Sequence, residues 1–287
     1  MITAFVQSHL LSFKSHLLVL NLCTASLARG ILGGFTFAGP SAIVGRWLFG
    51  PSCCQLFAFM HQLLGVFQMA ALTVLCFERF FMAKRMKFGK ELSIKFYIFC
   101  ISLCWVLSVG FSVPPLLKYG SFGCDVSGTT CSLDWRFTNK RQAAFNIPLV
   151  IFAGILPVFV IIVSLWKAIN LSRRILNSEM EWEQWSLTKS TVGLASVMLL
   201  LWTPQALLSG WVAVGGCCPW VSWLPRPPPP ALVLLAPLGA EASTMVPFLC
   251  YLAGEPRIRT SLLGRCKEDY GIIKGGRRSN GFRLISE

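Results

Sequence analysis

The sequence contains six apolar stretches that are each long enough to cross a membrane as a helix. The hydrocarbon core of a bilayer is about 30 Å thick, which a helix of ~20 residues spans. Charged residues make up 13% of the chain, against about 25% in soluble domains. We therefore predict an all-α membrane protein with six spans. They cover residues 16–38, 55–82, 94–117, 145–169, 190–214 and 230–253.

The net charge of +14 follows the predicted topology. With the N-terminus placed in the cytosol, 19 Lys and Arg residues lie in or beside cytosolic segments and six lie in outer loops. Such a bias is the positive-inside rule of membrane proteins. We therefore expect a multi-pass protein of the plasma membrane, held in the lipid bilayer, with its C-terminus in the cytosol. We expect no nucleic-acid partner.

The chain divides into three parts by composition. Residues 1–15 form an N-terminal remnant, residues 16–254 form the transmembrane bundle, and residues 255–287 form an amphipathic helix with a basic cytosolic tail. An amphipathic helix of this kind lies in the membrane surface. Cys266 at its end is a lipidation candidate, although an unmodified thiol fits the sequence equally well.

Charged residues inside the spans carry the functional information, because an ionisable group in hydrocarbon needs a partner or a task. They are Arg29, Glu78, Arg79 and Glu241. The first pair to consider is Glu78-Arg79, which ends the second span and is followed by Phe80. Taken alone, it also fits side chains that reach from a helix end to the interface.

The tripeptide Glu78-Arg79-Phe80 resembles the Asp/Glu-Arg-Tyr signature of rhodopsin-like G-protein-coupled receptors, with Phe in place of Tyr. Later spans carry counterparts of this family's landmarks in the same order: Trp105, Pro157 and Leu201-Trp202-Thr203-Pro204. The resemblance implies a rhodopsin-like seven-helix bundle. Because "NLCTAS" in the first span resembles the family's second helix, the first helix is missing and six spans remain.

The resemblance also implies a disulfide between Cys54, at the outer end of the second span, and Cys131, in the long outer loop. Cys53 and Cys124 are alternatives, so the sequence leaves the pairing open. Asp125, six residues before Cys131, matches a loop carboxylate that serves as counterion in some opsins.

Within this family the chain resembles opsins, and the neuropsin group above all, in "TTCSLDW" and "SLTKSTVGLASVMLLLWTPQALLSGW". The resemblance implies that Glu78 neutralises Arg79 at rest and that Arg79 reaches a heterotrimeric G protein when the helices spread. It also implies a retinal pocket, which in opsins contains a lysine of the last helix that binds retinal covalently.

The last span departs from this pattern. When Tyr251 is aligned with the final residue of the family's Asn-Pro-x-x-Tyr motif, Glu241 falls at the lysine position and Pro247 replaces the Asn. An alternative register places Ala240 there. In either register no lysine occurs between Lys189 and Lys267, and a carboxylate lacks the nucleophilic amine that the covalent bond requires. Retinal is therefore expected to bind non-covalently at most. Pro204, Pro247 and Tyr251 are interpreted as a remnant of the activation motif.

Arg29 lies three residues after Ser26, which replaces the Asp of the family's second helix. We predict that Arg29 and Glu241 form a buried ion pair across the ligand pocket, with Phe57 and Trp202 as further pocket residues. A protonated, hydrogen-bonded Glu241 and a last helix turned toward a water-filled cavity are the alternatives.

These observations predict an opsin-like receptor that is no enzyme and has neither a metal site nor catalytic residues. His16 and His61 are isolated in the sequence and are expected to be structural. One alternative is a receptor for another apolar small molecule. A second is a truncated product that does not signal, which Ser26 and Leu165 favour because both replace residues typical of the family.

Overall fold

The computed structural model describes residues 15–86, 92–135, 140–173, 179–217 and 228–254. The predicted surface helix, Cys266 and most of the N-terminal remnant lie outside these ranges. The elements run in the order α2 (His16–Arg29), η2 (Gly30–Ala38), α3 (Gly39–Val44), α4 (Gly50–Met86), α5 (Ile94–Ser112), η3 (Pro114–Leu117), β1 (Phe122–Cys124), β2 (Cys131–Leu133), α6 (Lys140–Leu149), η4 (Val150–Ile155), α7 (Leu156–Arg173), α8 (Glu179–Cys217), α9 (Pro230–Ala242) and α10 (Val246–Gly254).

Five continuous helical segments of the described residues are long and apolar enough to cross a membrane. They are His16–Val44, Gly50–Lys84, Ile94–Leu117, Arg141–Arg173 and Trp185–Val214. The pair α9 and α10 adds a sixth span that is bent by 54°. This confirms the six predicted spans.

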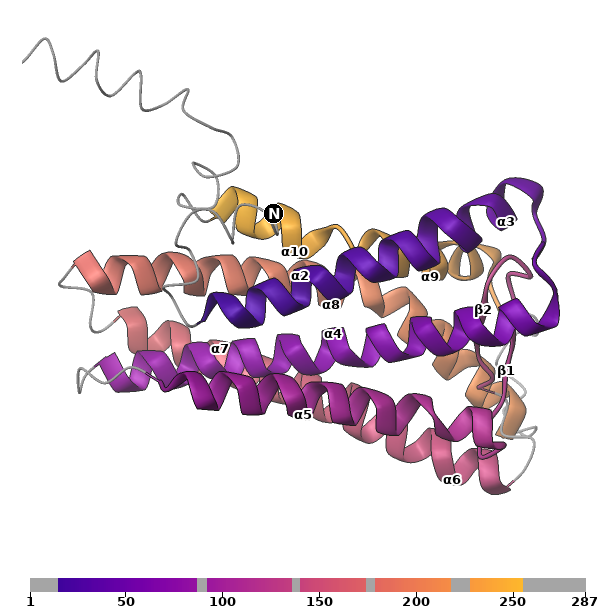
Figure 1. Ribbon diagram of the computed structural model, residues 1–287, viewed down its shortest axis with the longest axis horizontal. Coiled ribbons are helices and arrows are strands. Elements are labelled where there is room, and N and C mark those ends of the chain that lie inside the picture. Colours follow the sequence, from indigo (N-terminus) through magenta and orange to yellow (C-terminus); the bar gives the residue numbers. More distant parts are fainter. Residues whose placement is uncertain (1–14, 87–91, 136–139, 174–178, 218–227, 255–287) are drawn as a thin grey trace, which may run out of the picture.

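Helix α4 is the centre of the bundle. It packs against α2, α5, α7 and α8 and also touches both strands. The long helices run side by side along the longest axis of the molecule, and the two strands lie together at one end (Figure 1). Because α4 contacts nearly every other span, its side chains make up a large part of the contacts between helices along the whole bundle.

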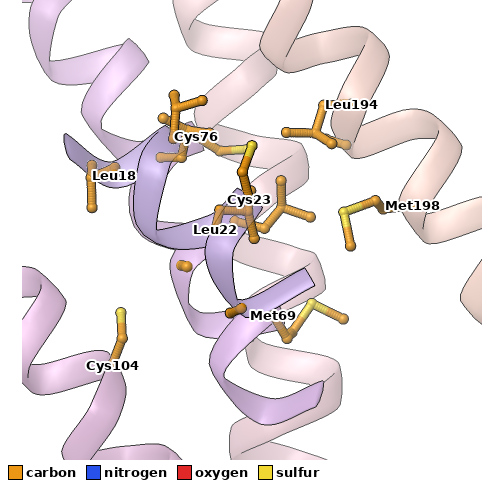
Figure 2. Close-up of a cluster of buried hydrophobic side chains, with 14 of the residues drawn as sticks. Leu18, Leu22, Cys23, Met69, Cys76, Cys104, Leu194 and Met198 are labelled. Atoms are coloured by element: carbon orange, nitrogen blue, oxygen red, sulfur yellow. The ribbon is translucent and has the colours of Figure 1, made fainter. Parts of the chain in front are cut away.

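The main core lies where α2, α4 and α8 meet. Leu22, Phe67 and Leu194 are each 0% exposed. Figure 2 shows leucine, methionine and cysteine side chains from these helices converging on one another: Leu18, Leu22, Cys23, Met69, Cys76, Leu194 and Met198. Buried free cysteines behave as small apolar residues, so this part of the core is apolar despite its sulfur content.

One end of the bundle carries a short antiparallel hairpin. Strand β1 pairs with β2 so that Phe122 lies opposite Leu133 and Cys124 lies opposite Cys131. A disulfide joins Cys131 to Cys54 at the start of α4, with Cα atoms 5.4 Å apart. The predicted disulfide is therefore confirmed, and Cys53 and Cys124 are free thiols.

The last span is interrupted between α9 and α10, and two hydroxyl groups bind the carbonyls at the end of α9. Ser243 Oγ donates to the Ala240 carbonyl at 2.6 Å, and Thr244 Oγ1 donates to the Glu241 carbonyl at 2.7 Å. Irregular backbone in a membrane persists only where its polar groups find such partners. Pro247 then lies in the first turn of α10, where a missing N–H breaks no helical bond.

Helices α8 and α9 approach each other closely at Gly239. A Cβ built on this glycine would lie 2.4 Å from the backbone carbonyl oxygen of Leu201. No real Cβ tolerates that distance from a rigid backbone atom, so any side chain here forces the helices apart.

We expect Gly239→Ala to lower the thermal midpoint of the purified protein, because overpacking of this kind destabilises a core by about 1–3 kcal/mol. Gly210→Ala on α8 is the matched control, since a Cβ at Gly210 meets nothing within 4 Å. A midpoint that is the same for both variants would contradict the close approach of α8 and α9.

Candidate functional site

A buried polar cluster lies at the end of α4 that carries Glu78 and Arg79. The Glu78 side chain is 0% exposed and that of Arg79 is 2% exposed. Arg79 Nε donates to Glu78 Oε2 at 2.6 Å, and the Arg79 guanidinium and the Glu78 carboxylate form an ion pair. The charges of these two groups therefore compensate each other inside the helix bundle.

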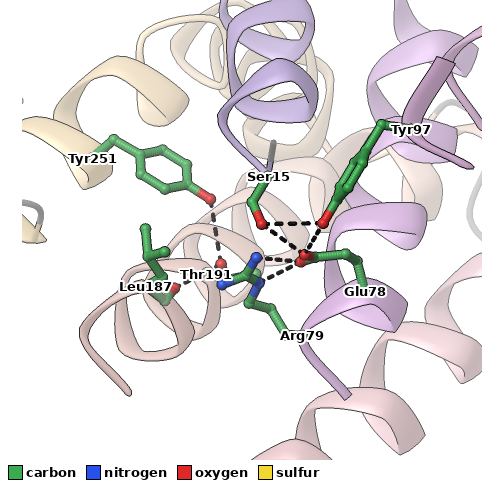
Figure 3. A network of polar contacts seen from close by, with 7 residues as sticks. All are labelled: Ser15, Glu78, Arg79, Tyr97, Leu187, Thr191 and Tyr251. Carbon is green, nitrogen blue, oxygen red and sulfur yellow. Dashed lines mark hydrogen bonds and ion pairs between the residues drawn. The ribbon is translucent and has the colours of Figure 1, made fainter. Parts of the chain in front are cut away.

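Two hydroxyl groups from other segments complete the bonding of Glu78. Ser15 Oγ, just before α2, and Tyr97 OH on α5 each donate to Glu78 Oε1 at 2.8 Å (Figure 3). The carboxylate thus joins three separate segments of the chain. Tyr97 is 1% exposed, so its hydroxyl is a buried group whose bond cannot easily be replaced by water.

Tyr251 from the last span lies near this cluster. Its hydroxyl is 3.3 Å from Thr191 Oγ1 on α8, and Thr191 in turn donates to the Leu187 carbonyl at 2.8 Å. Figure 3 shows Tyr251 and Thr191 beside the guanidinium of Arg79. Phe80 faces elsewhere, since Lys167 Nζ of α7 lies 5.7 Å from the centre of its ring.

A second buried cluster surrounds Arg29 at the end of α2. Arg29 Nη1 donates to Gln68 Oε1 at 2.7 Å, and Gln68 Nε2 donates to Ser26 Oγ at 2.7 Å. Ser26 Oγ donates to the Leu22 carbonyl at 2.8 Å. The guanidinium also lies 5.7 Å from the centre of the Trp202 ring, within the range of a cation–π contact.

His61 lies between Arg29 and Glu241. His61 Nε2 lies 2.8 Å from Arg29 Nη2 and 3.5 Å from Glu241 Oε1. Since a guanidinium only donates, Nε2 accepts and the imidazole is neutral in this arrangement. Among the described residues, Arg29 and Glu241 make no direct ion pair; His61 contacts both of them instead. The imidazole occupies the space where the two charges would have met.

Glycines on the first span accommodate Glu241. Built Cβ atoms at Gly33 and Gly34 would lie 3.4 Å and 3.0 Å from the Glu241 carboxylate oxygens. Both residues belong to η2, a π-helical segment that widens the backbone of the span. The carboxylate thus lies against bare backbone, and the side chains of His61 and Glu241 keep 24% and 23% exposure.

A cavity of about 210 Å³ adjoins this cluster between the first two spans. Its lining is apolar except for Arg29 and His61, and it includes Phe57. Of the other predicted pocket residues, Trp202 contacts Arg29 and Glu241 approaches His61. Three buried atoms of this region have no hydrogen-bond partner among the described residues: Arg29 Nε, Trp202 Nε1 and Glu241 Oε2.

His61 and Gln68 both belong to this cluster, although the sequence predicted only a structural role for His61 and no role for Gln68. One signal was available: Cys54, His61 and Gln68 follow one another at intervals of seven residues, about two helical turns. Residues spaced in this way share a helix face. That face of α4 is the one directed toward the Arg29 cluster and the hairpin of β1 and β2.

The loop carboxylate of Asp125 lies in the hairpin. Burial raises the pKa of Asp125 above its ordinary value, and the hydrogen bond from the Val126 N–H opposes this rise only in part. The Val126 N–H lies 2.7 Å from Asp125 Oδ1.

Comparison with known families matches residues 1–220 to the 7 transmembrane receptor (rhodopsin family). The visual pigment-like receptor peropsin of Mus musculus is 22% identical over 270 residues, which cover 92% of this chain and 77% of peropsin. Opsin-5 of Mus musculus is 24% identical over 214 residues, covering 70% of this chain and 56% of Opsin-5. Retinochrome of Todarodes pacificus is 29% identical over 143 residues, which cover 50% of this chain and 46% of retinochrome.

The crystal structure of squid rhodopsin has a similar fold. It superposes with a TM-score of 0.77 and 16% sequence identity, and the match covers 100% of this chain and 87% of that chain. At this level of identity the likeness concerns the fold alone. It confirms the bundle architecture predicted from the sequence.

We expect Tyr97→Phe to lower the thermal midpoint, because a hydrogen bond to a buried charge contributes about 1.5–3 kcal/mol. The phenyl ring keeps the packing, so the loss reports the hydroxyl alone. Tyr119→Phe is the matched control because Tyr119 is 58% exposed. Thermal unfolding in detergent measures both variants, and an unchanged midpoint for Tyr97→Phe would show that Glu78 does not need this donor.

Proposed function

Because the chain belongs to the rhodopsin family of seven-transmembrane receptors, we propose that it is an opsin-like receptor that signals through Glu78 and Arg79 to a heterotrimeric G protein. Members of this family are receptors and not enzymes, as the sequence predicted. Photoreceptors are among the similar proteins, which include opsins and rhodopsins by name.

The observation that carries the proposal is the buried Glu78–Arg79 pair. Its carboxylate accepts bonds from Ser15, Tyr97 and Arg79, so the guanidinium is held inside the bundle. Tyr251 and Thr191 bridge the last span and α8 beside it. This arrangement is a resting state in which Arg79 is unavailable to a partner. A signal is transmitted when a second state, with the guanidinium exposed, gains population.

The proposed orientation places this cluster at the cytosolic face of the plasma membrane. The Cys54–Cys131 disulfide lies near the opposite end of α4, and disulfides persist in oxidising compartments outside the cytosol. The basic segments that follow Glu78 and α10 in the sequence then face the cytosol, in agreement with the positive-inside rule. The C-terminus is accordingly proposed to be cytosolic.

Retinal does not fit this chain as a covalently held group. The last span has no lysine, and Glu241 with its carboxylate lies at the position that the resemblance assigns to it. A non-covalent ligand is compatible with the site, because the cavity beside Phe57 has an apolar lining apart from Arg29 and His61. Arg29 Nε is a buried donor without a hydrogen-bond partner among the described residues, which supports a ligand that carries a carbonyl or carboxylate oxygen. Retinal or another apolar small molecule with an oxygen at one end is therefore the proposed ligand class.

A second reading is a product that does not signal. Ser26 and Leu165 replace family residues, and both are fully used in packing or backbone bonds: Leu165 is 8% exposed, and Ser26 bonds Leu22 and Gln68. Neither position offers a spare polar group for activation. Measured G-protein activation separates the two readings.

We expect Glu78→Gln to raise basal G-protein activation in transfected cells. Removing one charge of a buried pair costs about 3–5 kcal/mol, and exposure of Arg79 relieves this cost. Arg79→Ala should abolish both basal and stimulated activation. Asp125→Asn is the control, because it makes the same kind of change at the opposite end of the molecule.

Surface expression of each variant is measured in parallel, so that loss of protein is separated from loss of signal. If the wild type and Glu78→Gln both reach the membrane and neither activates any G protein, the non-signalling product is the correct reading.

We also expect the wild type to form no covalent adduct with 11-cis-retinal that borohydride reduction makes permanent. Glu241→Lys should form such an adduct, because it supplies the amine at the position assigned to the family lysine. Ala240→Lys tests the alternative register and should remain unlabelled. Mass spectrometry of the reduced protein measures all three. Labelling of the wild type would contradict the claim that no last-helix amine is present, and labelling of Ala240→Lys alone would favour the other register.

A further inference from the structure

Three sulfur atoms gather at the outer end of the molecule. Two belong to the disulfide between Cys54 on α4 and Cys131 on β2. The third belongs to the free thiol of Cys124 on β1, which lies 3.9 Å from Cys54 Sγ and 3.9 Å from Cys131 Sγ. A thiol at this distance from both sulfurs of a disulfide is a potential participant in exchange.

The strand register permits a disulfide between Cys124 and Cys131. These residues lie directly opposite each other. The neighbouring pair is joined by a hydrogen bond from the Asp125 N–H to the Thr130 carbonyl at 2.9 Å, so Cys124 and Cys131 form the non-hydrogen-bonded pair of the ladder. Cα atoms in such pairs are about 4.5 Å apart, which lies within the range of ~4.4–6.8 Å that disulfides accept. The alternative bond therefore needs no strand movement.

Cys124 is also the accessible member of the three. Its residue is exposed, whereas Cys54 and Cys131 are 5% and 1% exposed. Cys124 lines a cavity of about 210 Å³ between the hairpin and α8, together with Gln205 and Ser209. Solvent can thus reach this thiol, while the disulfide itself is shielded from outside reagents.

We propose that Cys124 is a thiol–disulfide exchange site that acts on the chain's own Cys54–Cys131 bond. The Cys124 thiolate attacks Cys131 Sγ, and the new bond joins Cys124 to Cys131. The bond between Cys54 and Cys131 breaks, and its electron pair leaves on Cys54 Sγ. Cys54 takes up a proton in place of the one that Cys124 lost, so no oxidant or reductant is consumed. Because Cys124 Sγ is equidistant from the two sulfurs, it stands beside their bond, and its side chain rotates before it attacks in line.

The exchange changes what the hairpin is tied to. Before it, the disulfide joins β2 to α4; after it, the disulfide lies within the hairpin and α4 is released. The hairpin forms one wall of the outer cavity, so the release loosens the cover of the bundle at that end. The proposal does not depend on the ligand or on signalling.

Mapping of disulfides in the wild-type full-length protein tests the proposal. One sample in detergent is alkylated at acidic pH at once, and a second is first held at mildly alkaline pH without oxidant. Trypsin and a protease that cleaves before Asp then separate the three sulfurs into peptides 47–79, 119–124 and 125–133. We expect the 119–124/125–133 pair to rise from background during the incubation while the 47–79/125–133 pair falls by the same amount. The rate should be independent of protein concentration.

Two variants serve as controls. Cys124→Ser should keep the 47–79/125–133 pair unchanged, and Cys53→Ser, which removes the neighbouring free thiol, should behave like the wild type. The proposal is overturned if the wild-type pairing stays constant while Cys124 is recovered as an alkylated thiol. It is also overturned if the 47–79/119–124 pair forms instead, or if Cys53→Ser abolishes the exchange.

Discussion

The positive charge of a guanidinium inside a membrane must be balanced by groups that contact it or lie close to it. This requirement determines how the helices are arranged around Arg29. Arg29 is 4% exposed, and its bonds to Gln68 and His61 fix the first span against α4. The Trp202 ring holds the same group from α8, and the carboxylate of Glu241 approaches from the last span. Four spans thus meet at one charge. Because charged side chains at the bilayer centre are expensive, these contacts set how the helices face one another more strictly than apolar packing does.

Helix α4 carries polar groups at three depths, and each joins it to a different part of the chain. Cys54 binds the outer hairpin, His61 and Gln68 bind the Arg29 cluster, and Glu78 binds Ser15 and Tyr97. Between these levels the contacts are apolar, as in the core of Leu22, Phe67 and Leu194. Apolar side chains alone allow neighbouring helices to slide or rotate, since lipid is as apolar as leucine. The contacts that α4 makes at these three depths therefore fix how the neighbouring helices are aligned and rotated against it.

The spans could be predicted from the sequence because membrane thickness sets their length, and the disulfide could be predicted because the family resemblance extends to Cys54 and Cys131. The arrangement around Glu241 could not. Helical periodicity gives the face on which a residue lies, but the rotation of two helices relative to each other depends on side chains from a third. Here the third is His61, which enters between Arg29 and Glu241. Tyr97 was missed for a similar reason, because a tyrosine in an apolar span shows its polar role only when its partner Glu78 is placed opposite it. The sequence offers Cys124 as an alternative disulfide partner, but its equal distance from both bonded sulfurs depends on the strand register.

Glu241 does not need to touch Arg29 to stabilise it. The Coulomb energy of two charges falls only as the inverse of their separation, and within a protein it is screened far less than in water. The neutral imidazole of His61 lies between the two charges and accepts a hydrogen bond from the guanidinium through Nε2. The Glu241 carboxylate lies on the other side of His61 and supplies the opposite charge from there. The glycines of η2 give that carboxylate its space, since Cβ atoms at Gly33 and Gly34 would approach its oxygens to 3.4 Å and 3.0 Å. A lysine at position 241 would place a second cation against Arg29 and His61. The arginine and the glutamate are therefore coupled features of this chain: a site that keeps a buried arginine on its first span is best balanced by an acid, and not by an amine, on its last.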